Sequence, residues 1–200
     1  MNAKLNPSAP SGKTATAFLS DVAELRRRAR EHIEQGAVTG DYAADKQAVV
    51  KMLNDALATE LVCVLRYRRH YFAADGLLAE SVKSEFLAHA KEEQEHADKI
   101  AERIVQLGGE PDFDPAGLTS RSHSEYKPGK SLQDMIKEDV IAERIAIESY
   151  TEMVAFLAGR DATTRRLLES ILAVEEEHAE EMSSMLKNVN EFAATAGKRS

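Results

Sequence analysis

Apolar residues recur at steps of three and four along four stretches of the chain, at about 45–74, 78–107, 131–158 and 161–189. This spacing places them on one face of a helix, so each stretch is predicted to be an amphipathic helix. Gly76 separates the first two stretches and Gly159 the last two, and glycine is common where helices end. At about 1.5 Å per residue, each helix is roughly 40 Å long. The pattern predicts two helical hairpins.

The hairpins are joined by residues 108–130, a segment with three prolines and four glycines. A connection this long is uncommon in a compact domain. At about 3.3 Å per residue it can span the full length of a helix. We therefore predict an all-α four-helix bundle over residues 46–190, with one long crossover between helices 2 and 3.

The two ends of the chain differ from the bundle in composition. Residues 1–17 and 191–200 are predicted to be flexible tails. Residues 18–45 are predicted to hold a short N-terminal helix, ending at Gly36, and a linker. The apolar face of this helix consists of Phe18, Val22, Leu25, Ala29 and Ile33. Its four arginines are interpreted as a solvated or intersubunit face rather than a nucleic-acid site.

Each of the four apolar stripes carries a glutamate near its middle. These are Glu60, Glu93, Glu143 and Glu175. Charged residues are rarely buried without a partner. The first two lie almost equally far from Gly76 and the last two from Gly159, so folding at the glycines brings each pair to one level. The neighbouring glutamates at 92, 95, 176 and 177 fall off the stripes and are interpreted as surface charge.

Two histidines follow the same stripes. His96 lies three residues after Glu93 and His178 three residues after Glu175, so each pair shares a helix face. Four carboxylates and two imidazoles facing one another suit two divalent ions, which four negative charges would balance. Without metal the carboxylates would repel and hold protons. Metal binding is therefore predicted to release protons and raise the melting temperature.

Composition and charge exclude several functional classes. Glycine (10) and proline (5) are sparse and 43% of residues are hydrophobic, which fits one helical domain with a core. A net charge of −8 argues against wholesale nucleic-acid binding. No apolar run approaches the roughly 18 residues of a membrane span, and no signal peptide is recognisable. The single cysteine, Cys63, is typical of a reducing cytoplasm.

The pattern resembles the ferritin-like superfamily, and its bacterioferritin-type di-iron site in particular. The resemblance covers about residues 46–189 and rests on a lone Glu followed by Glu-x-x-His, repeated once. It implies that Glu60 and His96 hold one iron, that Glu143 and His178 hold the other, and that Glu93 and Glu175 bridge them. It also implies that Tyr67, seven residues after Glu60, lies beside the centre as a possible electron donor.

The resemblance implies a ferroxidase that oxidises Fe²⁺ with O₂ or H₂O₂. The iron would be stored in a homo-oligomeric shell, either dodecameric or with about 24 subunits. Two iron ions per subunit are expected, although manganese or zinc could occupy the same ligands. Haem-binding relatives carry Met where this chain has Gln94, so no haem is predicted.

Two other functions remain open. One is a peroxidase, an oxygenase or a manganese catalase with the same centre. The chain lacks the rubredoxin-like Cys-x-x-Cys domain of a rubrerythrin, which argues against that protein class. The other is protection of DNA against oxidative stress, as in the starvation-induced miniferritins, with DNA contacts only through the tails.

Several further residues near the predicted centre allow two interpretations. Tyr150 matches Tyr67 in the repeat. Either tyrosine could simply pack in the core, with its hydroxyl hydrogen-bonded to a residue that binds the metal. His89, one turn before Glu93, is an accessory ligand or a hydrogen-bonded core histidine. Cys63 is interpreted as a small buried apolar residue. His70, like the histidines at 32 and 123, carries no signal beyond that of a surface histidine.

Overall fold

The computed structural model describes residues 21–40, 42–76 and 78–196. The chain forms two compact units, residues 1–40 and residues 41–200. Among the described residues the structure is entirely helical and contains no strand. The prediction of an all-α protein is therefore confirmed. No helix in these described ranges is long and apolar enough to cross a membrane.

The described part of the N-terminal unit, residues 21–40, contains two short helices. Helix α1 spans Val22–Arg28 and a 3₁₀ helix, η1, spans Ile33–Gln35. The predicted continuous helix over 18–35 is wrong over its described part, because His32 adopts a left-handed conformation with φ of 53°. Its apolar face does not supply a core: Val22 and Ile33 are 57% and 75% exposed. Phe18 lies outside the described residues.

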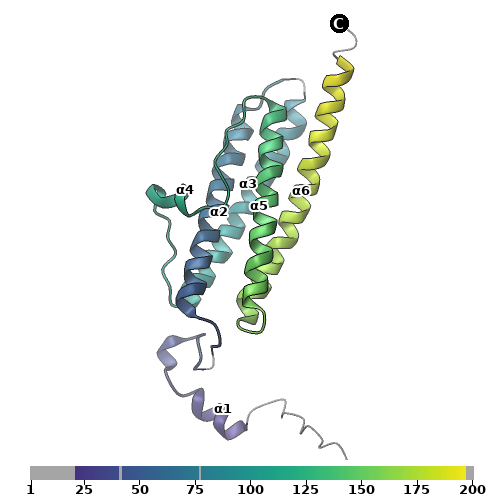
Figure 1. Cartoon of the computed structure of the whole chain (residues 1–200). Coiled ribbons are helices and arrows are strands. Elements are labelled where there is room, and N and C mark those ends of the chain that lie inside the picture. Colours follow the sequence, from purple (N-terminus) through teal and green to yellow (C-terminus); the bar gives the residue numbers. More distant parts are fainter. Residues whose placement is uncertain (1–20, 41, 77, 197–200) are drawn as a thin grey trace, which may run out of the picture. The chain divides into compact units, whose positions relative to one another are not determined.

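The second unit is a bundle of four long helices (Figure 1). They are α2 (Lys46–Ala73), α3 (Ala79–Gln106), α5 (Leu132–Leu157) and α6 (Ala162–Ala196). Helices α2 and α3 form one hairpin and α5 and α6 the other, as predicted. Gly76 and Gly159 lie in the two turns with φ of +107° and +71°, a conformation that favours glycine.

Helix α6 is longer than the sequence pattern predicts. It continues to Ala196, past the predicted boundary at residue 190. Residues 190–196 (NEFAATA) contain three alanines and no glycine or proline, so helix propensity alone favours continuation. Phe192 remains 43% exposed, which is why the apolar stripe gave no signal there.

The crossover runs along α2 from one end of the bundle to the other. Asn54 on α2 binds the backbone of Glu110 and Asp112, at distances of 3.1 and 2.7 Å. About four turns farther along, Arg69 donates to the Pro128 carbonyl. Between these points the segment forms the 3₁₀ helix η2 (Pro115–Gly117) and the short helix α4 (Leu118–Arg121). Leu118 of α4 packs against apolar residues of α2. The long crossover was predicted, but these two short helices were not.

A buried ionic network ties α2, α5 and the crossover together. The Arg66 Nε donates to Asp139 Oδ1 at 2.9 Å, and the other oxygen of Asp139 lies 2.8 Å from Nδ1 of His70. All three side chains are at most 1% exposed. Arg66 also donates to Ser124 in the crossover at 3.0 Å. The interpretation of His70 as a surface histidine is therefore wrong, because the crossover covers it.

We predict that Asp139→Asn lowers the free energy of unfolding of the metal-free protein by about 3–5 kcal/mol. The substitution leaves the Arg66 guanidinium buried without its counter-charge. Denaturant unfolding at one protein concentration measures the change. Glu148→Gln, at an exposed acid of the same helix, is the control and should change stability by less than about 0.5 kcal/mol. Equal effects of the two substitutions would contradict the structural importance of the network.

Candidate metal centre

The six predicted ligands converge at the middle of the bundle. Each of the four long helices contributes a glutamate, and α3 and α6 each add a histidine one turn later. The residues are Glu60 from α2, Glu93 and His96 from α3, Glu143 from α5, and Glu175 and His178 from α6. Every one of these residues is at most 2% exposed. The structure thus brings together all the residues that the stripes singled out.

The ligand atoms divide into two groups of four residues. One group contains Glu60 and His96, and the other contains Glu143 and His178. Both groups also contain Glu93 and Glu175, and within each group the potential ligand atoms lie within 4.8 Å of one another. Two metal positions that share two carboxylates would produce this arrangement.

The two shared glutamates turn one oxygen toward each histidine. His96 Nδ1 lies 3.5 Å from Glu93 Oε2 and 2.9 Å from Glu175 Oε1. His178 Nδ1 lies 3.7 Å from each of the opposite oxygens, Glu93 Oε1 and Glu175 Oε2. A carboxylate that presents its two oxygens to two different imidazoles has the orientation of a bridging ligand.

Hydrogen bonding separates the shared glutamates from the other two. Both oxygens of Glu93 and of Glu175 are buried without a hydrogen-bond partner, as is Nδ1 of each histidine. The short His96–Glu175 contact therefore lacks hydrogen-bond alignment. Glu60 and Glu143 each leave only Oε2 unpartnered. Buried polar atoms are normally satisfied, so this concentration of unpartnered ligand atoms fits bound metal.

Two tyrosines satisfy the remaining oxygens in a reciprocal way. The Tyr67 hydroxyl, from α2, donates to Glu143 Oε1 on α5. The Tyr150 hydroxyl, from α5, donates to Glu60 Oε1 on α2. Both tyrosines are at most 1% exposed. Each hairpin thus orients one glutamate of the other hairpin, Glu143 or Glu60. Both tyrosines therefore form the hydrogen bond to a predicted ligand that one of their two interpretations expected.

Protons compensate for charge in the metal-free centre. Burial, followed by the charges of Glu93 and Glu175, raises the pKa of Glu60 and of Glu143 well above the usual range of a carboxyl group. Burial acts against protonation of His96, but the facing carboxylates outweigh it and raise its pKa to about 12. The same balance raises the pKa of His178 to about 11. Burial disfavours the Glu93 charge, yet the two facing imidazoles lower its pKa overall.

Comparison with known proteins identifies the family to which this fold belongs. The family described as Ferritin-like domain matches residues 50–192. The chain belongs to the ferritin-like domain family. A bacterioferritin of Desulfovibrio desulfuricans is 27% identical over 158 residues, which cover 77% of this chain and 84% of that protein. A DNA protection during starvation protein of Pyrococcus furiosus is 30% identical over 138 residues, covering 67% and 74% of the two chains.

A solved structure extends the similarity to the fold. The bacterioferritin-related protein of Bacteroides fragilis, described as a dodecameric thioferritin, matches with a TM-score of 0.73 and 30% identity. The match covers 76% of this chain and 92% of that one. The resemblance to the ferritin-like superfamily and the four-helix bundle are therefore confirmed.

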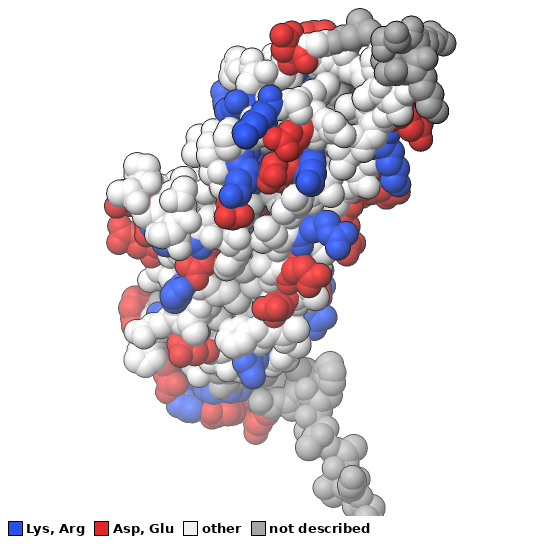
Figure 2. Space-filling model, turned by 45° about the horizontal axis from the view of Figure 1, so that its top comes forward, with Lys and Arg blue, Asp and Glu red and all other residues white. Residues whose placement is uncertain are grey.

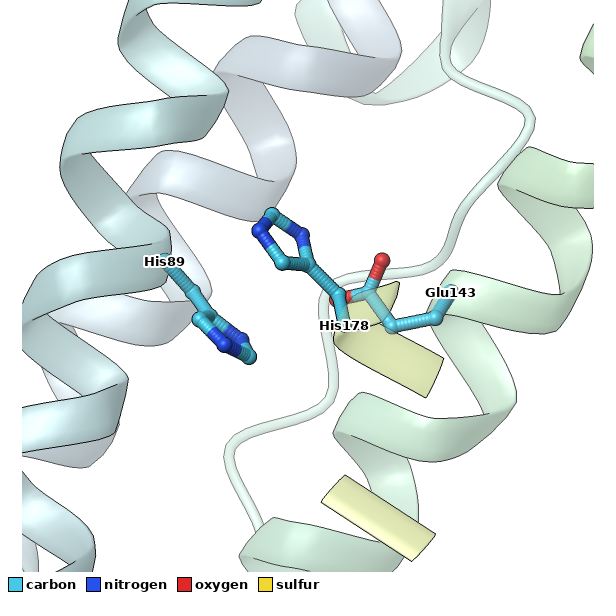
Figure 3. A group of neighbouring side chains, drawn as sticks. All are labelled: His89, Glu143 and His178. Atoms are coloured by element: carbon cyan, nitrogen blue, oxygen red, sulfur yellow. The ribbon is translucent and has the colours of Figure 1, made fainter. Parts of the chain in front are cut away.

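Two polar residues of this ferritin-like bundle adjoin His178. His89 was interpreted as an accessory ligand or a hydrogen-bonded core histidine. Glu92 was interpreted as surface charge and is exposed, yet its Oε2 also lies 2.6 Å from His178 Nε2. This contact leaves His178 Nδ1 facing the centre. The His89 ring stacks on the His178 ring at 3.9 Å between centroids (Figure 3). Periodicity could not reveal the Glu92 contact, because Glu92 lies off the apolar stripe of α3 and its side chain reaches a histidine on the adjacent helix α6.

Cys63 lies one turn from Glu60 and is 2% exposed. Burial raises the pKa of its thiol well above the usual value. Its sulfur lies 3.4 Å from an Arg66 nitrogen. Cys63 is therefore a small buried residue, as predicted. It does not belong to either group of potential ligands.

We predict that Zn²⁺ binding at pH 7 releases at least two protons per chain. His96 and His178, with pKa values of about 12 and 11, hold protons at that pH and must lose them to bind metal. Metal affinity should consequently rise with pH. Calorimetry in buffers of different ionisation enthalpy counts the protons, and zinc avoids any redox contribution.

Glu95→Gln is the control, because Glu95 is an exposed residue of α3 and should leave the proton count unchanged. The metal should also raise the melting temperature of the wild type. Tight zinc binding without proton release would contradict the charge distribution described for the metal-free centre.

Proposed function

We propose that this protein is a ferroxidase that oxidises Fe²⁺ at the centre of the bundle. The observation that carries the proposal is the pair of ligand groups that share Glu93 and Glu175. The unpartnered atoms of these groups supply two imidazole nitrogens and six carboxylate oxygens. This donor set suits ferrous ions, and zinc or manganese could also bind. The bacterioferritin relatives support iron over the other two metals.

The substrates and the balance of the reaction are simple. Two Fe²⁺ ions give up one electron each. Hydrogen peroxide accepts the two electrons and two protons and yields two waters, or O₂ accepts them and yields hydrogen peroxide. The four glutamates balance the charge of two ferrous ions, since both imidazoles become neutral on binding. The protein brings the two one-electron donors together at one place.

Tyr67 is our candidate for a catalytic residue beside the centre. Its hydroxyl binds Glu143 and also lies 3.1 Å from His89 Nδ1. Tyr150 has the matching bond to Glu60 but no matching histidine. A buried phenol can supply an electron to the centre while its proton moves to the carboxylate to which it already donates. The imidazole can then donate a hydrogen bond to the phenoxyl oxygen. Tyr67 therefore differs from its counterpart in a way that fits redox use.

We also propose iron storage in a homo-oligomeric shell, dodecameric or with about 24 subunits. The Bacteroides fragilis relative is described as a dodecamer, and bacterioferritins are among the other relatives. Large apolar side chains on the bundle unit support subunit contacts, since several are between 40% and 75% exposed. These residues are Leu65, Phe72, Phe113, Ile141 and Phe156. The single cysteine supports a cytoplasmic location.

Protection of DNA is the second candidate, because one 30%-identical relative is a DNA protection during starvation protein. The net charge of −8 weakens it. On the face shown in Figure 2, basic and acidic side chains alternate and form no continuous basic surface. With a net charge of −8, DNA contact is expected through the terminal segments, which carry Lys4 and Lys13. A salt-sensitive gel shift that disappears when residues 1–17 are removed would support this function.

We predict that Glu93→Gln lowers the rate of Fe²⁺ oxidation at least about 100-fold. Glu93 belongs to both ligand groups, and loss of even an outer hydrogen-bond partner costs about 10–100-fold in metal affinity or activity. Stopped-flow absorbance with O₂ or H₂O₂ measures the rate. Glu95→Gln, two residues away on the exposed side of α3, is the matched control and should behave as the wild type.

Retained oxidation in Glu93→Gln would refute the centre as the ferroxidase site. Iron loading of the wild type separates storage from catalysis alone. Storage predicts a ratio of iron to chain far above two together with a mineral core in sized particles. A catalase would instead evolve O₂ from peroxide with manganese bound and accumulate no mineral.

We predict that Tyr67→Phe slows Fe²⁺ oxidation more than Tyr150→Phe does. Both variants lose one hydrogen bond to a terminal glutamate, so the pair isolates any redox contribution of Tyr67. Rapid-freeze electron paramagnetic resonance should detect a tyrosyl radical that is absent in Tyr67→Phe and present in Tyr150→Phe. Equal rates and identical radical signals in the two variants would reduce Tyr67 to a positioning residue.

A further inference from the structure

A second cluster of potential ligands lies between α3 and α6, outside the six-residue centre. Glu85 and His89 are one turn apart on α3, and Glu181 faces them from α6. The potential ligand atoms of these three side chains lie within 4.8 Å of one another. His89 is 1% exposed, Glu85 is partly exposed, and the Glu181 side chain is 55% exposed. The cluster thus extends from the buried core to the surface.

The outer side of the cluster opens into an acidic groove. The groove has a volume of about 540 Å³, and Glu85, Glu177, Glu180 and Glu181 line it. No lysine or arginine is among its described lining residues. Negatively charged carboxylates that line a concave surface raise the local concentration of cations.

The inner side of the cluster contacts the proposed centre through His89. Its Nδ1 faces the Tyr67 hydroxyl at 3.1 Å. Its ring stacks on the ring of His178, which Figure 3 draws near it. His89 also forms a three-residue group of potential ligand atoms with Glu143 and His178, again within 4.8 Å. One imidazole therefore lies between the groove and one half of the centre.

The contacts of His89 leave its outer nitrogen beside a carboxylate of the groove. The Tyr67 hydroxyl donates its proton to Glu143, so its oxygen accepts from His89 Nδ1. His89 Nε2 lies 2.9 Å from Glu181 Oε2. Both of these atoms can be metal ligands. A divalent cation bound by both would take the place of the proton that an ion pair between them requires.

We propose that Glu85, His89 and Glu181 form a binding site for one divalent cation, a third site in each chain. Two carboxylates and one imidazole suit Fe²⁺, Mn²⁺ or Zn²⁺, with water completing the coordination. The ion would lie next to the Glu143 and His178 half of the centre. Its role as a supply position for Fe²⁺ rests on the proposed ferroxidase function, whereas the binding site itself does not.

The internal repeat supplies an argument that the third site belongs to one half only. His89 lies four residues before Glu93. The matching position four residues before Glu175 is Ile171, which is apolar and 1% exposed. The other half of the centre therefore has no equivalent of His89, and one additional ion per chain is expected rather than two.

Anaerobic equilibrium binding of Zn²⁺ to the full-length chain tests the proposal. We expect three ions per wild-type chain and two per Glu85→Gln/Glu181→Gln chain. The matched control is Glu177→Gln/Glu180→Gln, which removes two charges from the same groove and should retain three ions. Fe²⁺ oxidation at low iron concentration should be about tenfold slower in the first double variant, in line with the cost of losing metal-site partners.

Two ions per wild-type chain, or equal losses in the two double variants, would overturn the third site and leave His89 ion-paired with Glu181. Failure of the proposed function gives a different result. In that case Glu93→Gln would retain both inner ions and full oxidation, while the count at the groove could still fall with Glu85→Gln/Glu181→Gln. The two proposals can therefore fail independently.

Discussion

Burying four carboxylates and two imidazoles at one level of a helical bundle is unfavourable unless positive charge accompanies them. In the metal-free protein, protons supply that charge, because His96 and His178 have strongly raised pKa values. Divalent ions can replace those protons without moving the helices, since the ligand atoms already lie within 4.8 Å in each group. Much of the bundle serves this constraint. The two glycine turns set the level of each glutamate pair, and the crossover permits the second hairpin to begin at the correct end.

The reciprocal tyrosines show how an internal repeat can stabilise such a centre. Tyr67 and Tyr150 each come seven residues after a terminal glutamate and each bind the terminal glutamate of the other hairpin. Half of each of these carboxylates is thereby held in place, and the remaining oxygen is left for a metal. Glu93 and Glu175 have no such partner, so both of their oxygens stay available. Hydrogen bonding alone thus separates Glu60 and Glu143 from Glu93 and Glu175, as expected if the first two were terminal ligands and the other two bridged the metals.

The sequence was sufficient to predict the parts of the structure that depend on helix periodicity. A glutamate on an apolar stripe conflicts with burial, and four such conflicts at matched depth identified Glu60 and its counterparts. Residues whose environment depends on another segment were harder to predict. His70 is buried because the crossover covers it, and the path of a crossover leaves no periodic signal. Glu92 lies off its stripe and reaches His178 only because α3 and α6 are adjacent. The extension of α6 to Ala196 depends on helix propensity rather than burial, so the stripe ended before the helix did.

The two halves of the centre are not equivalent, although the repeat makes their ligands so. His178 has Glu92 on its outer nitrogen and His89 stacked on its ring. The positions that match these two residues in the repeat are Val174 and Ile171, both apolar. The half of the centre at Glu143 and His178 therefore adjoins ionisable groups that continue to the surface groove, whereas the matching positions of the other half are apolar. Ion exchange with solvent requires polar contacts along the way, because a bare cation does not cross an apolar region. If both halves bind metal, the ion at Glu143 and His178 should therefore exchange faster than the ion at Glu60 and His96.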